Sequence, residues 1–260
     1  MVAGKAAPGY VQAKRCIKFI SAIGDVVNND PEIGDIMKVL FLPNYNVSNA
    51  QVIIPAADIT QQISTAGYEA SGTGNMKFVM NGAIIVGTMD GANVEIAEEV
   101  GEKNMFIFGA RVEEVEDIRR DLGNRSHENT SLGRVFEAMN SGRFGNPKEM
   151  GPLFESLQGG NDFYILTHDF YDYVEKMDAA AKTYVDQPEQ WEKMSIMGIL
   201  SMDKFSSDRT IKEYADDIWN VQPCKIPQPS TTEMNRVKSQ TNVISAKEAR
   251  QSKKESMLEQ

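Results

Sequence analysis

Apolar residues recur at two different spacings along the first half of the chain, and the two spacings predict alternating helices and strands. From about Pro8 to Asn28 they return every three or four residues, which predicts an amphipathic helix. Short continuous apolar runs predict buried strands in KVLFLPNY (38–45), AIIVGTMDG (83–91) and NMFIFGA (104–110). QVIIPAAD (51–58) fits either a strand or a short helix, because a proline interrupts it.

The segment ANVEIAEEVGE (92–102) separates two of these predicted strands and has helical spacing. Gly101 follows its last apolar residue, where a helix commonly ends. Strands alternating with helices predict an α/β fold with a Rossmann-like parallel sheet and flanking helices. We expect the sheet to extend to about residue 109 and a helix-rich flank to cover 111–220.

The amino-acid composition changes near Val221, where the chain becomes polar and rich in residues that disfavour a packed core. We therefore expect residues 1–220 to form the folded domain and 221–260 to form a disordered tail. The formal net charge of −10 argues against nucleic-acid binding, which needs a basic surface. No apolar run reaches the roughly 18 to 20 residues of a membrane span, so no membrane association is predicted.

Cysteine and histidine are scarce and dispersed. Cys16 and Cys224 are too far apart in sequence for a zinc-ligand pair or a disulfide framework, which favours a reducing, cytoplasmic location. His127 and His168 have no third ligand in view, so no metal site is predicted.

The stretch SGTGNMK (71–77) predicts an anion site, because small residues lead into a helix whose first backbone N–H groups are free to bind a phosphate. A Walker A loop is excluded, since Phe78 follows Lys77 where that motif needs Ser or Thr. The dinucleotide fingerprint fails because Lys77 occupies its third small position.

Lys77 is expected in the first turn of that helix, where the macrodipole disfavours an ammonium and favours the neutral amine that condenses with an aldehyde. A phosphate-bearing aldehyde such as pyridoxal 5′-phosphate would use both features. The alternative from the residues alone is a solvent-facing lysine after a common Gly-x-Gly. Asp90 and Asn93 are interpreted as a strand-end turn and a helix cap.

A longer stretch adds a family resemblance. EASGTGNMKFVMN (69–81) is similar, position by position, to the cofactor-attachment signature of the α-1,4-glucan phosphorylases, which act on glycogen, starch and maltodextrin. GKAAPGY, IPAADITQQISTAG and TMDGANVEI also resemble the C-terminal domain of that family. The resemblance runs from about residue 2 to 222 and weakens between about 121 and 162. It implies a GT-B glycosyltransferase, of which this chain would be part of the C-terminal, cofactor-binding half.

The resemblance also implies roles for particular residues. Lys77 would form the Schiff base with pyridoxal phosphate, with Thr73 and Gly74 holding the cofactor phosphate and Tyr45 packing at the cofactor. Glu69, Ser71 and Gly72 would contact the glucosyl unit. Tyr10 would belong to an inhibitor or nucleoside site at the pocket mouth.

The implied reaction is phosphorolysis of terminal α-1,4 glucosyl units by inorganic phosphate, giving α-D-glucose 1-phosphate with retention. The cofactor phosphate would exchange a proton with the substrate phosphate. The full enzyme would be a homodimer with an N-terminal domain that this chain lacks, so the isolated chain is expected to be inactive. The alternative is a non-catalytic binding or regulatory module, derived from a phosphorylase, that binds pyridoxal phosphate or a sugar.

Overall fold

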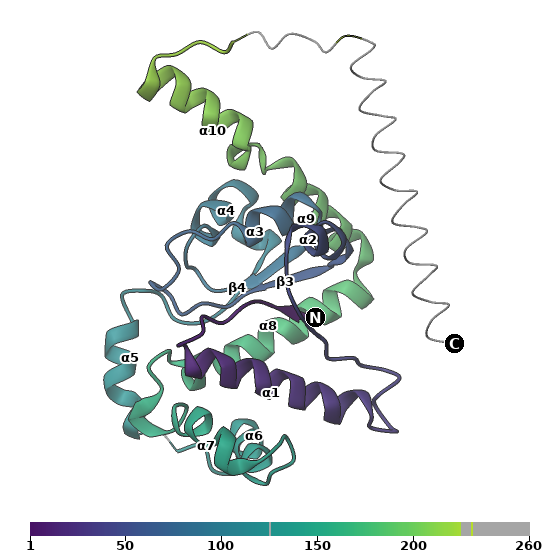
Figure 1. Cartoon of the computed structure of the whole chain (residues 1–260), viewed down its shortest axis with the longest axis vertical. Coiled ribbons are helices and arrows are strands. Elements are labelled where there is room, and N and C mark those ends of the chain that lie inside the picture. The colour runs from purple at the N-terminus through teal and green to yellow at the C-terminus, as the bar shows by residue number, and fades with distance from the viewer. Residues whose placement is uncertain (125, 225–229, 231–260) are drawn as a thin grey trace. The chain divides into compact units, whose positions relative to one another are not determined.

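Two parallel sheets organise the first part of the chain. The computed structural model describes residues 1–124, 126–224 and 230, and the chain divides into two compact units, Met1–Arg209 and Thr210–Gln260. In the first unit, β1 (Val2–Ala3) pairs with β2 (Phe41–Leu42). A second sheet has the order β3-β4-β5, formed by β3 (Ile59–Gln62), β4 (Ile84–Gly87) and β5 (Phe106–Ile107). All these pairs are parallel, so each return connection crosses over through a helix (Figure 1).

Helices make up most of the remaining described structure. The first unit holds α1 (Val11–Asn28), α2 (Val47–Ile53), α3 (Gly74–Met80), α4 (Asn93–Val100), α5 (Val115–Asp121), α6 (Ser131–Asn140), α7 (Pro147–Glu155), α8 (Leu166–Asp186) and α9 (Pro188–Leu200). Single 3-10 turns are η1 (Ile54–Ala56), η2 (Glu102–Asn104), η3 (Leu122–Asn124), η4 (Gly159–Asn161) and η5 (Asp203–Phe205). The helix α10 (Ser207–Glu213) and the π-helical η6 (Tyr214–Trp219) follow in sequence.

Strand β4 lies at the centre of the three-stranded sheet and is buried on both faces. Side chains alternate along a strand, so Ile85 points to the opposite face from Ile84 and Val86. Ile85 packs in a cluster with α3 and α4, whereas Ile84 and Val86 pack against α8 and α9. Helices therefore cover both faces of this sheet, with α3 and α4 above it and α8 below it in Figure 1.

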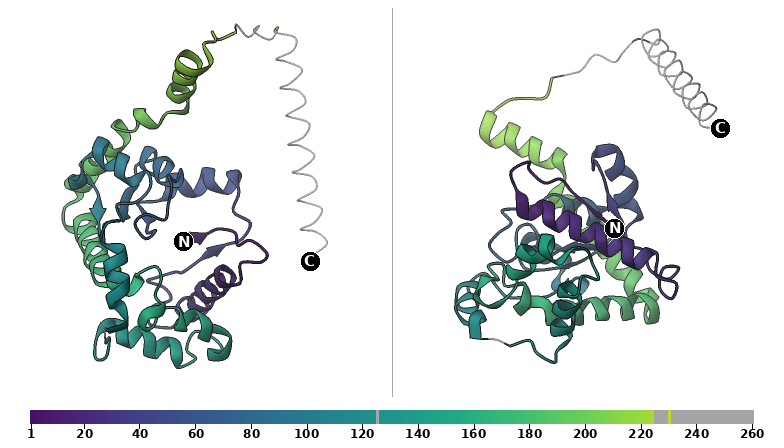
Figure 2. Two further views of the ribbon diagram at one scale, coloured as in Figure 1. Left: turned by 90° about the vertical axis from the view of Figure 1, so that its left-hand side faces the viewer. Right: turned by 60° about the horizontal axis from the view of Figure 1, so that its bottom comes forward.

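A separate apolar cluster joins α1 to α6 and α7. Phe19 of α1 meets Phe154 of α7 edge to face, with 5.4 Å between the ring centroids, and Met139 and Met150 are buried beside them. These helices are the purple and teal ribbons that lie together in Figure 2. Burial in this cluster raises the pKa of the Cys16 thiol above its usual range.

Several predicted elements are confirmed, with adjusted ends. The first helix begins at Val11 instead of Pro8, because Tyr10 precedes its first turn with non-helical angles. The strands expected in 83–91 and 104–110 are β4 and β5, and the helix between them ends at Gly101, whose φ is +84°. The ambiguous segment 51–58 is helical, as the end of α2 and η1, since proline is tolerated at the start of a helical turn.

Other elements differ from the predictions in extent or were not predicted. The strand predicted over 38–45 pairs only at Phe41–Leu42, where both residues are half-buried. Its partner β1 was not predicted, and neither was β3, whose sequence ITQQ is mostly polar. Helices α5 to α9 occupy most of 115–200, within the range expected to be rich in helix. The disordered tail predicted for 221–260 lies outside the described residues, apart from 221–224 and 230.

No described helix is long and apolar enough to cross a membrane.

Candidate functional site

The carboxyl ends of β3 and β4 bring two loops together. The strands pair in parallel up to Gln62 and Gly87, so the residues that follow each strand leave the same edge of the sheet. Two bonds continue the pairing: the Thr88 amide donates to the Gln62 carbonyl (3.1 Å), and the Thr88 hydroxyl donates to the Ser64 carbonyl (2.6 Å). The loop after β3 leads directly into the signature segment 69–77.

Asp90 lies in the turn after β4 and is buried, with 5% of its surface exposed. One carboxylate oxygen, Oδ2, accepts from the Ser64 hydroxyl (2.7 Å) and the Glu69 amide (2.9 Å). The other, Oδ1, accepts from the Gly67 amide (2.8 Å). The loop after β3 is therefore wrapped around one carboxylate.

Asn93 connects the same turn to the start of α3. Its side-chain oxygen accepts from the Asn75 side-chain amide (2.9 Å), and its own amide nitrogen donates to the Thr88 carbonyl (3.0 Å). Both asparagines are buried. Asn93 was expected to cap α4, but Ala92 is the residue before the helix and Asn93 is the first helical residue, with its side chain used for this bridge.

Lys77 is exposed, and its ammonium nitrogen lies 3.5 Å from the Thr73 hydroxyl. The prediction that Lys77 occupies the first turn was wrong, because α3 has seven residues and Lys77 lies in its last turn. The helix stops early at Asn81, and Gly82 follows with φ +92°. The side chain reaches back along the helix to Thr73, the residue before α3.

Thr73 and Gly74 lie at the start of α3 and are both exposed. Within the part of the chain that the structure describes, their backbone N–H groups donate to no protein acceptor. A Cβ added at Gly74 would meet nothing within 4 Å, so the surface beside this residue is open. The geometry suits an anion, with Lys77 on the adjacent turn.

Glu69, Ser71 and Gly72 are presented on the loop before α3. The Glu69 carboxylate is exposed and accepts no hydrogen bond from any described residue, although its backbone amide is held by Asp90. The Ser71 carbonyl accepts from the Ala92 amide (2.6 Å). Gly72 has φ +83°, a conformation that favours glycine. The main chain is fixed while the Glu69 side chain stays available.

Tyr10 and Tyr45 lie on other elements, and none of their described contacts reaches residues 69–77. Tyr45 is half-buried in the loop between β2 and α2. Tyr10 precedes α1 and lines a mainly apolar cavity of about 430 Å³ together with Cys16 and Leu153. A hydrogen bond with Tyr10 raises the pKa of the Tyr164 hydroxyl above its usual range.

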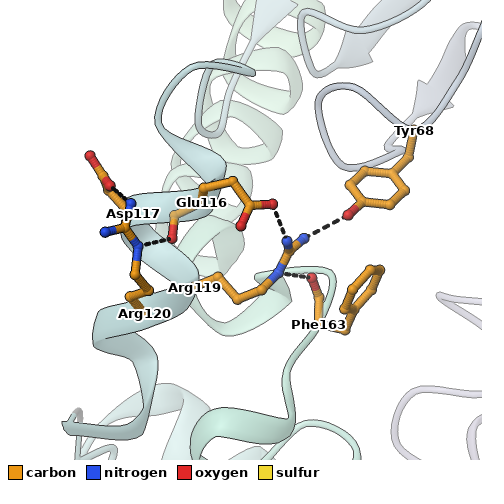
Figure 3. A network of polar contacts seen from close by, with 6 residues as sticks. All are labelled: Tyr68, Glu116, Asp117, Arg119, Arg120 and Phe163. Carbon is orange, nitrogen blue, oxygen red and sulfur yellow. Dashed lines mark hydrogen bonds and ion pairs between the residues drawn. The ribbon is translucent and has the colours of Figure 1, made fainter.

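Arg119 contacts the outer side of the Glu69 loop, which sequence reasoning missed. Its guanidinium donates to the Tyr68 hydroxyl (2.8 Å) and to the Phe163 carbonyl (3.0 Å), and it pairs with Glu116 (2.5 Å). Figure 3 shows the guanidinium between Tyr68 and Phe163, and it lies 4.2 Å from the centre of the Phe163 ring. The arginine ties the residue before Glu69 to α5 and to the loop before α8.

Carboxylates of α8 hold the end of β5 in a similar way. The Ala110 amide donates to Asp169 (3.0 Å), and the Gly109 amide donates to Asp172 (2.8 Å). Burial, together with the nearby charges of Asp172 and Asp162, raises the pKa of Asp169, against the lowering effect of the Ala110 bond and His168. Among the described residues, no group of three or more His, Cys, Asp or Glu side chains could hold a metal ion.

The elements define a class of protein: an α/β chain whose parallel strands end at a loop carrying an exposed lysine beside free helix amides. Comparison with known proteins makes that class specific. The family model for carbohydrate phosphorylases matches residues 1–221, and the chain belongs to this family.

Curated phosphorylases from different organisms are similar in sequence to this chain. Glycogen phosphorylase 2 of Dictyostelium discoideum is 51% identical over 227 residues, which cover 87% of this chain and 23% of that protein. Glycogen phosphorylase of a Synechocystis species is 52% identical over 86% of this chain and 27% of its own length. The H isozyme of alpha-glucan phosphorylase from Solanum tuberosum is 46% identical over 87% of this chain and 28% of its own length. The chain thus spans about a quarter of the length of the curated relatives that it matches.

Proposed function

We propose that this chain forms the pyridoxal-phosphate-binding part of an α-1,4-glucan phosphorylase with GT-B architecture and a Rossmann-like sheet. The observation that carries the proposal is the segment 69–77, in which the exposed Lys77 stands beside the free amides of Thr73 and Gly74. Membership of the family supports the same reading, because these positions resemble its cofactor-attachment signature. We assign residues 1–220 to this domain and 221–260 to a tail.

The residues present fit the cofactor. Lys77 would attach it covalently through its amine, and the amides at the start of α3 would bind its phosphate as a helix N-terminus binds an anion. Tyr45 would pack against it from the loop after β2. The chemistry that the bound cofactor supplies in this family is proton exchange between its phosphate and the substrate phosphate.

The sugar side of the site would be formed by Glu69, Ser71 and Gly72. The Glu69 carboxylate is free of protein partners in the described structure, so it can accept a hydrogen bond from a sugar hydroxyl. The main chain at Ser71 and Gly72 would contribute further polar contacts. Tyr10, which lines the apolar cavity, would frame an inhibitor or nucleoside site.

For the whole protein we propose phosphorolysis of terminal α-1,4 glucosyl units to α-D-glucose 1-phosphate, in the cytoplasm and as a homodimer. The isolated 260 residues are expected to form no glucose 1-phosphate, because the proposed active site needs the N-terminal domain of the full enzyme. The second candidate is a non-catalytic module that binds pyridoxal phosphate or a sugar. The exposed Lys77 and the free amides of Thr73 and Gly74 would also serve binding without catalysis, which is all that this candidate requires.

Borohydride trapping tests the proposed cofactor site. The purified chain is incubated with pyridoxal phosphate, reduced, digested and analysed by mass spectrometry for the modified lysine. We expect one major site at Lys77, which Lys77→Ala abolishes. Lys103→Ala is the matched control, because Lys103 is also an exposed lysine on a short helical turn and should leave the Lys77 label intact. Labelling spread over many lysines, unchanged in Lys77→Ala, would rule out the site.

A further inference from the structure

The turn after β4 runs alongside the signature segment and contacts it residue by residue. Asp90 accepts from the amides of Gly67 and Glu69. Ala92 donates to the carbonyl of Ser71, and Asn93 bonds to the side chain of Asn75. Successive residues of the turn therefore hold successive points of the segment that leads into α3.

The turn is itself fixed by the sheet. It follows β4, whose four residues are all buried between β3 and β5. Asn93 is bonded to the Thr88 carbonyl, and the Asn93 amide is bonded to the Asp90 carbonyl (3.2 Å). A buried strand thus supports the turn that holds the loop after β3.

Gly91 shows how close the two segments are. Its φ is +53°, and a Cβ built there would lie 2.5 Å from the Ser71 carbonyl oxygen and 2.9 Å from the Glu69 side chain. Real Cβ atoms do not approach backbone oxygens this closely. Any side chain at this position would push the Glu69–Ser71 main chain away from the turn.

A carboxylate at position 90 can accept from all three donors, which are the Ser64 hydroxyl and the amides of Gly67 and Glu69. A carboxylate offers two acceptor oxygens with lone pairs for several bonds, and hydrogen bonds to a charged acceptor are stronger than neutral ones. An asparagine would turn an N–H₂ group toward the Gly67 amide or toward the Ser64 and Glu69 donors. At least one of these three donors would then face another donor.

We propose that Asp90, supported by Gly91 and Asn93, is a positioning residue that sets the main-chain path of residues 67–71 and so places Glu69 and the start of α3 for ligand binding. This role rests on the proposed function, because it concerns the same site. Asp90 itself does not touch ligand. The turn acts through the backbone, leaving the Glu69 carboxylate free.

Hydrogen exchange of the ligand-free chain tests the positioning independently of any cofactor. In Asp90→Asn we expect the amides of the 64–71 peptides to exchange about tenfold faster or more, because bonds to a charged acceptor are lost. Peptides covering β4 should keep the exchange rates of the unaltered chain. Asp117→Asn is the matched control, since that carboxylate is exposed and, among the described residues, pairs with Arg120 on the surface of α5. Unchanged exchange over 64–71 in Asp90→Asn would overturn the proposal.

Gly91→Ala provides a second, independent perturbation if Asp90→Asn proves unfolded and exchanges quickly everywhere. It leaves the carboxylate in place and crowds the Ser71 carbonyl, so exchange should again rise over 67–71 while β4 stays protected. A folded Gly91→Ala chain with unaltered exchange over 67–71 would refute the role of the turn.

Borohydride trapping then links the positioning to the site. If Lys77 is labelled in the unaltered chain, half-maximal labelling of Asp90→Asn should need several-fold more pyridoxal phosphate, with no such change in Asp117→Asn. Equal labelling curves for a variant with a loosened loop would refute the functional part of the inference. Failure of the unaltered chain to label at Lys77 would count against the proposed function, while the exchange result would still decide whether Asp90 fixes the loop.

Discussion

Asp162 fixes the start of the long helix α8, and its replacement by alanine should destabilise the chain strongly. The side chain is 1% exposed. Its Oδ2 accepts from the Thr167 amide (2.7 Å) and hydroxyl (2.8 Å), and its Oδ1 accepts from the Leu166 amide (3.1 Å). Ile165, immediately before the helix, is buried with φ +49°, so this strained entry depends on the carboxylate for its hydrogen bonds.

The magnitude follows from which donors lose their acceptor. Thr167 is buried, so water cannot readily replace the two bonds that its amide and hydroxyl make. Each buried donor left unsatisfied costs about 1–3 kcal/mol, so Asp162→Ala should lower the free energy of unfolding by about 2–5 kcal/mol. For a domain of this size the melting temperature should fall by about 5–15 °C. Asp162→Asn keeps one acceptor oxygen and should lose about 1–2 kcal/mol.

Urea unfolding measures this loss through the fluorescence of Trp191, which is buried between α9 and the sheet. Asp178→Ala is the control, because it removes the same charge from an exposed position within α8, the helix whose start Asp162 fixes. The reasoning is refuted if the unfolding free energies of Asp162→Ala and Asp178→Ala agree within about 0.5 kcal/mol, the usual range for neutral surface changes.

Three further predictions concern other contacts. Burial raises the pKa of Asp169 above 3.8, so ionisation of this carboxyl destabilises the fold as pH rises. The melting temperature of Asp169→Asn, relative to that of the unaltered chain, should therefore increase from about pH 3.5 to about pH 7. A difference that does not change with pH would contradict this. Arg119→Ala should lower the free energy of unfolding, measured in urea, by about 1–2 kcal/mol. Arg120→Ala, on the same helix but exposed, should change it by less than about 0.5 kcal/mol. Equal losses would contradict the contacts of Arg119 with Tyr68 and Phe163 in Figure 3. Ile96→Ala should lower the free energy of unfolding by about 2–4 kcal/mol in the same assay, because Ile96 is fully buried between α4 and the sheet. A decrease below about 1 kcal/mol would mean that the surrounding side chains collapse to fill the cavity.

The strands that could be predicted from the sequence are apolar, whereas the missed strand β3 is mostly polar. β4 is a continuous apolar run that needs burial on both faces, so its pattern alone identifies it. β3 carries Thr and two Gln in its four residues, and it is a strand because β4 supplies a partner, which is a tertiary effect. β2 is shorter than its apolar run because β1 offers only two residues for pairing and Pro43 follows with no N–H to donate.

The segment that forms the candidate site could be predicted from the sequence, but the residues that hold this segment in place could not. The small residues before Lys77 identify the loop, whereas the partners of that loop come from the neighbouring strand end. One signal was available: the carboxyl ends of adjacent parallel strands meet, so a polar residue after the second strand should face the loop after the first. Asp90 was interpreted as a turn residue because local sequence carries no information about the amides of Gly67 and Glu69.

The two-sided burial of β4 sets an order for events during synthesis. Most of the cluster on its Ile85 face is present once α3 and α4 have emerged from the ribosome, with Met202 added later. The Ile84 and Val86 face must wait for Ala180, Trp191 and Met194. These residues are made roughly a hundred positions later, which at about 5–20 residues per second leaves an apolar sheet face uncovered for about 5–20 s. During that interval the nascent sheet is a substrate for chaperones, and slowing translation between α4 and α9 would lengthen its exposure to aggregation.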